Sequence, residues 1–104
     1  MLDGPKSLVM EGELTIYTAL DKKAAILSHL KSGKKLEVDL SKISEIDAAG
    51  IQLMILAKRE AHVAGKELNF VVNSNIEQTL ELARLTEPLL GKGPMNSRLF
   101  GAAS

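Results

Sequence analysis

The stretch LEVDLSKISEIDAAGI (residues 36–51) decides the fold of this chain. In its first half Leu36, Val38 and Leu40 alternate with acidic residues, which is the period-two pattern of a β-strand with one buried face. A polar run follows, and we expect Ile46 to be the last inward-facing side chain before the chain turns. The end of the stretch begins a helix, so this one segment predicts a strand, a turn and a helix start.

The predicted helix opens at Asp47, runs to about Ala64 and ends at Gly65. Ile51 and Ile55 project to one side and make its apolar face wider than packing on a sheet requires. We expect these two side chains to form a small exposed apolar anchor; the alternative is that neighbouring helices cover them. The residues expected to pack on the sheet are Leu53, Met54, Ala57, Ala61 and Ala64.

On the N-terminal side, the spacing of apolar residues predicts two short strands around a turn in residues 7–16. A helix follows from Thr18, where Thr18 and Asp21 fit a capping box, and it ends at Gly33. His29 lies opposite the apolar stripe of this helix, so we expect a solvated imidazole. The stripe consists of Leu20, Ala24, Leu27 and Leu30.

On the C-terminal side, a strand is predicted from Leu68 to Val72, and its run of bulky apolar residues indicates burial on both faces. Ser74 and Glu77 fit a second capping box, and the helix that they begin is expected to end at Pro88. The residues of this helix that are expected to face inward are Ile76, Leu80 and Ala83, joined by Leu82 or Leu85.

The resulting order is two strands followed by alternating helices and strands, which is typical of an α/β domain with right-handed crossovers. We expect a mostly parallel or mixed sheet of about four strands, covered by three to four helices. Residues 1–90 form one domain in this prediction, and residues 91–104 form a flexible tail. Partners of such sheets are usually met at the carboxyl ends of the strands, which here points to the Asp47–Gly50 turn.

Composition excludes several classes of function. The 104 residues include 13 Lys+Arg, 13 Asp+Glu and no Cys, so nothing drives binding to nucleic acid and no thiolate metal site can form. Apolar runs are far shorter than a membrane span and no apolar signal stretch opens the sequence, so we expect a cytoplasmic protein. No nucleophile can be paired with a base. We therefore predict that the chain is not an enzyme and has no catalytic residue, metal or cofactor.

The turn after the central strand is the segment that best suggests binding. Asp47 caps the helix, while Ala48, Ala49 and Gly50 leave its start without bulky side chains, so that a partner can approach the backbone. An ordinary capped helix start is an equally weighted alternative. The predicted partner-binding residues are Asp47, Ala48, Ala49, Gly50, Ile51 and Ile55.

At these residues the sequence resembles the STAS domain, a family named for sulfate transporters and anti-sigma-factor antagonists. The resemblance covers about residues 7–87. It rests on GELTIYTA (residues 12–19), on VDLS (38–41) with the turn IDAAGI (46–51), and on GKEL (65–68) with the helix over 76–85. Finer features of the same segments look most like small stand-alone STAS proteins that accompany bacterial chemotaxis components.

The resemblance implies a binding switch: in anti-sigma-factor antagonists, phosphorylation of a hydroxyl in the turn breaks the complex with a kinase-like anti-sigma factor. This chain departs from that pattern. Ala48 and Ala49 cannot accept a phosphate, so the phosphorylation site is degenerate, and Thr15 stands where the family commonly has an Asp. Ser41 and Ser44, just before the turn, are the remaining hydroxyls close by.

We therefore expect a non-enzymatic adaptor that docks a kinase-like or chemotaxis partner without a phosphoserine switch. On this hypothesis Gly50→Arg abolishes partner binding and leaves the fold unchanged. The alternatives are the STAS subunit of a phospholipid ABC transporter, which clasps an ATPase, and a STAS domain that senses a small ligand. Whether two copies associate through the sheet edge is left open.

Overall fold

The described residues form a sheet of three parallel strands in the order β1-β2-β3. The structure is a computed structural model, which describes residues 4–91. The elements are β1 (Lys6–Leu14), α1 (Ala19–His29), β2 (Lys35–Ile46), α2 (Ala48–Val63), β3 (Glu67–Val71), α3 (Ser74–Leu82) and α4 (Thr86–Leu90). The α/β class and the parallel order are confirmed, and the described residues contain one strand fewer than expected. Of the predicted tail, all residues after Gly91 lie outside the described part.

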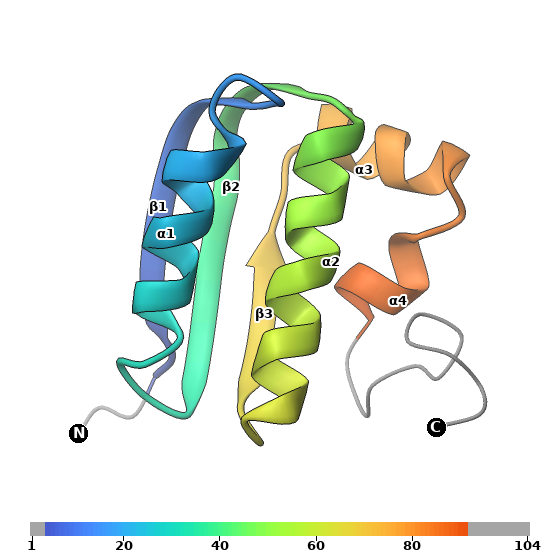
Figure 1. The fold of residues 1–104 in the computed structure, drawn as a ribbon. Coiled ribbons are helices and arrows are strands. Elements are labelled where there is room, and N and C mark those ends of the chain that lie inside the picture. The colour runs from blue at the N-terminus through green and yellow to red at the C-terminus, as the bar shows by residue number, and fades with distance from the viewer. Residues whose placement is uncertain (1–3, 92–104) are drawn as a thin grey trace.

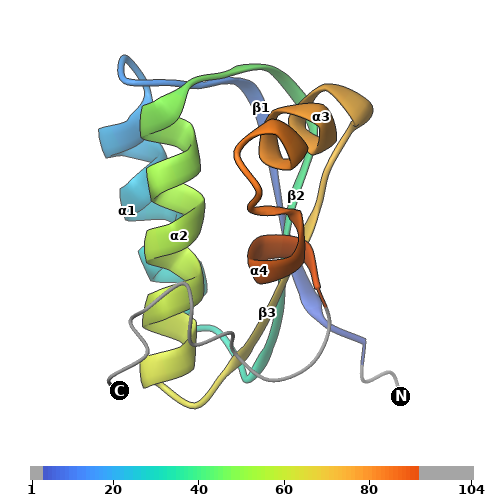
Figure 2. The same ribbon diagram turned by 90° about the vertical axis from the view of Figure 1, so that its right-hand side faces the viewer.

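Helices α1 and α2 lie side by side on one face of the sheet, and α3 and α4 lie at its β3 edge (Figures 1 and 2). Within residues 4–91 no helix covers the opposite face. The prediction that the last strand is buried on both faces is therefore wrong: Phe70 is buried, whereas its neighbour Val71 is 38% exposed. None of the described helices is long and apolar enough to cross a membrane.

Residues 6–14 form one strand, not the two short strands that the sequence predicts. The sequence predicts a turn around Gly12, and Gly12 does adopt a positive φ of 83°. The strand nevertheless continues through it, because β1 stays paired with β2 on both sides, up to Leu14 beside Ile46. Leu8, Met10 and Leu14 keep the even spacing and face the core.

Strand β2 is longer than the alternating segment that predicts it. Between Val9 and Glu11 the pairing on β2 advances from Asp39 to Lys42, and a further β2 residue is skipped beside Gly12 and Glu13. Both extra residues therefore belong to β2, as in a β-bulge. Each extra residue in β2 moves the inward-facing side chains from every even position to every odd position, or back. For this reason the sequence loses its regular alternation of apolar and polar residues after Leu40.

Helix α1 begins at the predicted residue with a different cap and a partly different buried stripe. Thr18 is the N-cap residue, but its hydroxyl makes no cap hydrogen bond; it donates to the Glu13 carbonyl oxygen at 2.8 Å. Leu20 and Ala24 are exposed, and the buried residues are Ile26 and Leu30. The predicted stripe is therefore confirmed at Leu27, which packs against the core, and at Leu30, and it is wrong at Leu20 and Ala24, which face solvent.

The C-terminal helices also differ from the prediction. Asn73, rather than Ser74, caps α3: its Oδ1 accepts from the Ile76 N–H at 2.9 Å. The helix ends at Leu82, and Pro88 lies inside the separate helix α4. A proline is tolerated there because backbone N–H groups in the first turn of a helix have no intrahelical acceptor. Ile76 and Leu80 are buried as predicted; Ala83 and Leu82 are exposed, and Leu85 packs against the core.

His29 is not the solvated side chain expected from the sequence. It is half-buried, and its Nε2 lies 3.1 Å from the carbonyl oxygens of Lys6 and of Glu37. The ring therefore links the end of α1 to the first residues of two strands. A stripe analysis of α1 alone could not find this contact, since both partners come from other elements.

Truncating a core leucine of α3 gives a direct test of this packing. Leu80 is fully buried, so we expect Leu80→Ala to lower the free energy of unfolding by about 2–5 kcal/mol through lost burial and a cavity. Leu82→Ala, in the same helix at a side chain 88% exposed, should change it by no more than about 0.5 kcal/mol. Urea denaturation measures both. Equal effects of the two variants would contradict the orientation of α3.

Candidate partner-binding site

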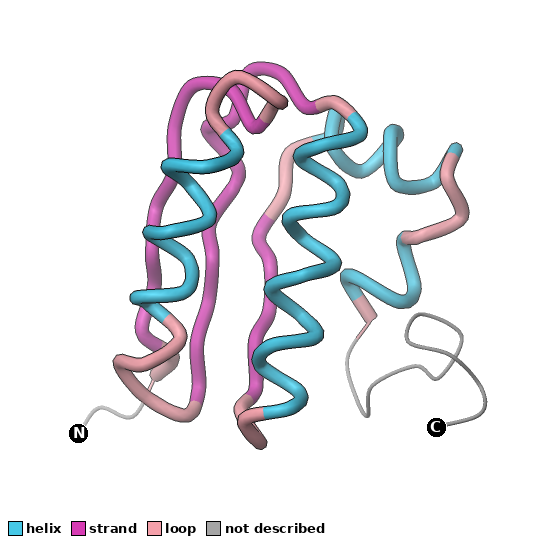
Figure 3. Tube along the Cα trace, viewed as in Figure 1, coloured by secondary structure: helices cyan, strands magenta, loops and turns pink. Residues whose placement is uncertain are grey.

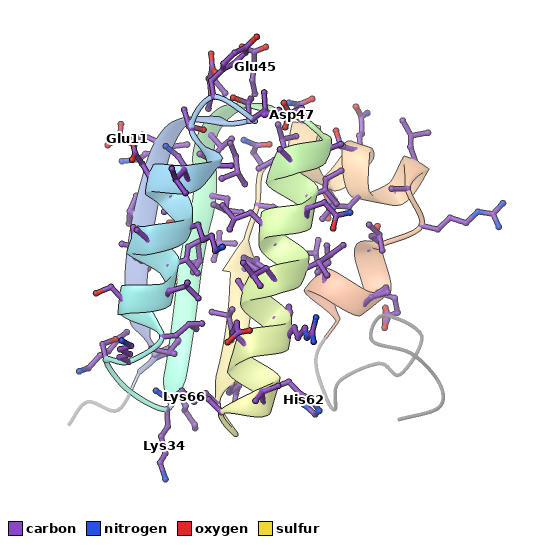
Figure 4. All side chains as sticks on the ribbon, in the orientation of Figure 1. Glu11, Lys34, Glu45, Asp47, His62 and Lys66 are labelled. Atoms are coloured by element: carbon purple, nitrogen blue, oxygen red, sulfur yellow. The ribbon has the colours of Figure 1, made fainter. Side chains whose placement is uncertain are left out.

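The start of α2 and the loop from β1 to α1 meet at one end of the molecule (Figure 3). This is the end where the carboxyl termini of β1 and β2 lie, and Figure 4 places Glu45 and Asp47 there, far from His62 near the other end of α2. In parallel sheets the loops at this edge commonly carry binding sites. The site is therefore built from residues 15–18 and from the first turns of α2.

Asp47 ties these two segments together. One carboxylate oxygen accepts from the Gly50 N–H at 3.1 Å, which caps α2, and the other accepts from the Ile16 N–H at 3.0 Å. The Asp47 N–H in turn donates to the Leu14 carbonyl oxygen at 3.3 Å. The hydrogen bond from Ile16 is the main reason why the pKa of Asp47 is lowered, and the bonds from the helix start add to it. The cap was predicted; the second bond was not.

Gly50 faces the protein's own backbone. It is buried, and a Cβ atom on it would lie 2.1 Å from the Leu14 carbonyl oxygen and 2.8 Å from Cγ1 of Ile46. The prediction that Gly50→Arg leaves the fold unchanged is therefore wrong. The end of β1 lies against the helix start at Gly50. The prediction of a close contact at Gly50 is therefore confirmed, but the contact is made by the protein's own backbone and not by a partner.

Hydrogen bonds hold the loop between β1 and α1 in one conformation. Thr15 is buried; its hydroxyl donates to a Glu13 carboxylate oxygen at 3.1 Å and accepts from the Tyr17 N–H at 3.3 Å. The Thr15 N–H donates to the Thr18 hydroxyl oxygen at 3.1 Å. This conformation turns Ile16 and Tyr17 outward, where they are 69% and 90% exposed.

A shallow apolar groove of about 360 Å³ lies beside this loop, between α1 and α2. Leu20, on the first turn of α1, stands at it and is 79% exposed. The groove is lined by Ile16, Ala19, Leu20, Lys23, Ala49, Gln52, Leu53 and Leu56. Lys23 is its one charged lining residue within the described chain, so the groove suits an apolar side chain better than a polar ligand.

The family model described as "Mlab, STAS domain" matches residues 3–91, which is most of the chain. This chain belongs to the STAS family. The match extends over all the described strands and helices, so the site lies wholly within the STAS domain.

The predicted binding residues of the STAS domain fall into three groups. Ala48 is exposed at the start of α2, and Ala49 lines the groove. Ile51 and Ile55 are half-buried, pack against the core and do not line the groove. Asp47 and Gly50 hold the site in shape.

Sequence reasoning missed the exposed apolar residues on the α1 side of the groove. Ile16, Tyr17 and Leu20 lie within five residues of one another. The sequence does carry a signal for them. The start of α1 holds more large apolar side chains than a single buried helix face can accommodate, so some of them must be exposed. Leu56 lines the groove from α2.

Hydroxyl groups near the turn of the STAS domain are engaged in hydrogen bonds. Ser41 donates to an Asp39 carboxylate oxygen at 2.6 Å, and this bond is the main reason for the lowered pKa of Asp39. Ser44 donates to the Gly12 carbonyl oxygen at 3.0 Å. Among residues 4–91 no group of three or more His, Cys, Asp or Glu side chains is placed to hold a metal ion.

The contact of Gly50 with β1 predicts a large effect from one added methyl group. Gly50→Ala should lower the free energy of unfolding by about 1–3 kcal/mol, because a backbone oxygen occupies the space of the new Cβ. Gly33→Ala is the matched control, since the nearest atom to its Cβ is 3.5 Å away in a flexible Lys6 side chain. Thermal or urea unfolding measures both. A stabilised Gly50→Ala variant would contradict the close approach.

The lowered pKa of Asp47 predicts a pH dependence with a definite sign. Its ionised form is favoured by folding, so the stability that it contributes is present above the ordinary value of 3.8 and is lost as the pH falls through the lowered value. Asp47→Asn retains one acceptor oxygen and does not titrate. We expect the wild type to be more stable than Asp47→Asn at neutral pH, with a difference that shrinks in acid.

Urea midpoints measured from neutral pH into acid test this expectation. Asp21→Asn removes the same charge from an exposed residue in the first turn of α1 and serves as the control. A difference between wild type and Asp47→Asn that stays constant down to strongly acidic pH would contradict the role of the carboxylate.

Proposed function

We propose that this STAS domain is a non-enzymatic protein-interaction module that docks a bacterial signalling protein, of the kinase-like or chemotaxis type, in the cytoplasm. The observation that carries the proposal is the apolar groove beside the Asp47–Gly50 turn, lined by exposed Ile16 and Leu20, with exposed Tyr17 next to Ile16 in the chain. Burying one such side chain contributes about 1.5–3 kcal/mol, so leaving three in water favours association.

The chemistry of the groove suits a protein partner. Interfaces are rich in large apolar residues at their centre with polar groups at the rim, and here Ile16 and Leu20 line the groove together with Lys23 and Gln52. A partner that inserts an apolar side chain between α1 and α2 and places a carboxylate near Lys23 would satisfy both kinds of group. Ala48 and Ala49 would let its backbone come close to the start of α2.

Binding in this proposal does not depend on phosphorylation of the turn. Ala48 and Ala49 carry no hydroxyl, and the nearby Ser41 hydroxyl is bonded to a carboxylate that would repel an added phosphate. Release of the partner would then require a change in the conformation or modification of the partner itself. Without such a change the complex would be permanent.

Affinity capture tests the proposal with a matched pair of variants. Leu20→Asp places a charge at the groove on an exposed side chain, so it should leave the fold intact and reduce capture of the partner by at least about tenfold. Leu82→Asp, equally exposed but on α3, should capture as well as the wild type. The bait is the whole chain, and bound proteins from its host's lysate are identified and quantified by mass spectrometry.

The identity of the captured protein separates the candidate functions. A kinase-like, anti-sigma or chemotaxis protein that is lost with Leu20→Asp supports the proposal. An ATPase of an ABC transporter in the same role would replace it with the transporter-subunit function. Capture that is equal for both variants would show that the groove is not the docking surface, and a thermal shift with GTP, ATP or fatty acids would favour ligand sensing.

A further inference from the structure

Strand β1 has a free edge at the opposite side of the sheet from α3 and α4. It pairs with β2 alone, and no other described strand lies beside it (Figure 1). The N–H and C=O groups of alternate residues along such an edge have no partner in the sheet, which makes the edge a template for another strand. β3, at the other edge, has α4 in contact with it.

The edge of β1 is regular enough to pair. Both extra residues of the β1–β2 ladder belong to β2, so β1 keeps its alternation from Lys6 to Glu11, and its break comes at Gly12 with its positive φ. A bulge in an edge strand normally protects that strand from pairing with another chain. Here both bulges are in β2, the inner strand, so they do not protect the edge of β1. Val9 at the middle is 49% exposed and Leu8 is half-buried.

The order of charges along β1 selects its own copy in the antiparallel direction. Lys6 stands at one end, Glu11 and Glu13 stand at the other, and the apolar segment lies between them. Figure 4 shows Glu11 at the β1 side of the molecule, pointing away from the other elements. Parallel in-register pairing of two copies would oppose Lys6 to Lys6 and Glu11 to Glu11 on the same face of the sheet, which is destabilising. Antiparallel pairing opposes no like charges, because it brings the basic end of one strand to the acidic end of the other.

We propose that two copies of this chain associate through β1 in antiparallel pairing centred on Val9, which joins the two sheets into one of six strands. In this register Val9 faces Val9 of the second copy, and Leu8 faces Met10, so each pair lies on one face of the sheet. Lys6 then faces Gly12 of the second copy and Ser7 faces Glu11, so no like charges oppose each other. The groove between α1 and α2 takes no part, so this association is independent of partner docking.

Val9 and Val71 offer a matched pair of variants, because both flank Asp39 in the same row of the sheet and face the same side. Val9→Lys places two ammonium groups against each other at the symmetry axis and should raise the dissociation constant of the dimer by at least about tenfold. Val71→Lys meets the same Asp39 on the far strand and should leave that constant within about twofold of the wild type. Sedimentation velocity from low micromolar to near-millimolar protein measures both.

Cross-linking tests the register separately. The chain contains no Cys, so Val9→Cys provides a single thiol. Opposed residues in an antiparallel pair have Cα atoms about 4.5–5.5 Å apart, within disulfide range. Mild oxidation should therefore link Val9→Cys into a dimer much faster than Val71→Cys.

Three results would overturn the proposal: a wild type that is monomeric at all concentrations, a dimer that Val9→Lys does not weaken, or equal cross-linking of the two cysteine variants. None of them bears on capture of a partner through Leu20, so the two proposals fail independently.

Discussion

The close approach of α2 to the end of β1 is the constraint on which the binding end of the molecule depends. Gly50 lets the helix start lie against the Leu14 carbonyl oxygen, and Asp47 bonds to the helix start on one side and to the Ile16 N–H on the other. Helix α2 and the β1–α1 loop are thus held as one unit. Ile16, whose N–H is held by Asp47, also lines the groove, so the contacts that fix the start of α2 and the exposed groove share this residue.

A second constraint is the length of β2. Its two extra residues let a strand of 12 residues pair with the 9 of β1 without disturbing the alternation of β1. The strand thereby reaches Ile46 at the level of Leu14, which brings Asp47 to the loop that it must cap. Without the added length, the turn would begin short of the end of β1, and its carboxylate could not reach the Ile16 N–H.

Local signals in the sequence predicted the local structure, and failed where other elements intervene. Asp47 as a cap and the packing of Leu53, Met54 and Ala57 follow from neighbours within one helix, and they are confirmed. The stripe of α1 is right at Leu27 and Leu30 and wrong at Leu20, because the exposure of Leu20 depends on where α2 lies. The role of Gly50 depends on Leu14, 36 residues earlier in the chain, and the groove exists only once two helices have been brought together. The family resemblance was confirmed, while the residues that line the groove needed the structure.

The points at which the described part of the chain begins and ends have a practical meaning. The first residues of β1 and the end of α4 lie toward the end of the molecule opposite the Asp47 turn (Figure 1). The points at which the described fold begins and ends are therefore remote from the groove. A reporter inserted directly before β1 or directly after α4 would start away from the surface that a partner would cover.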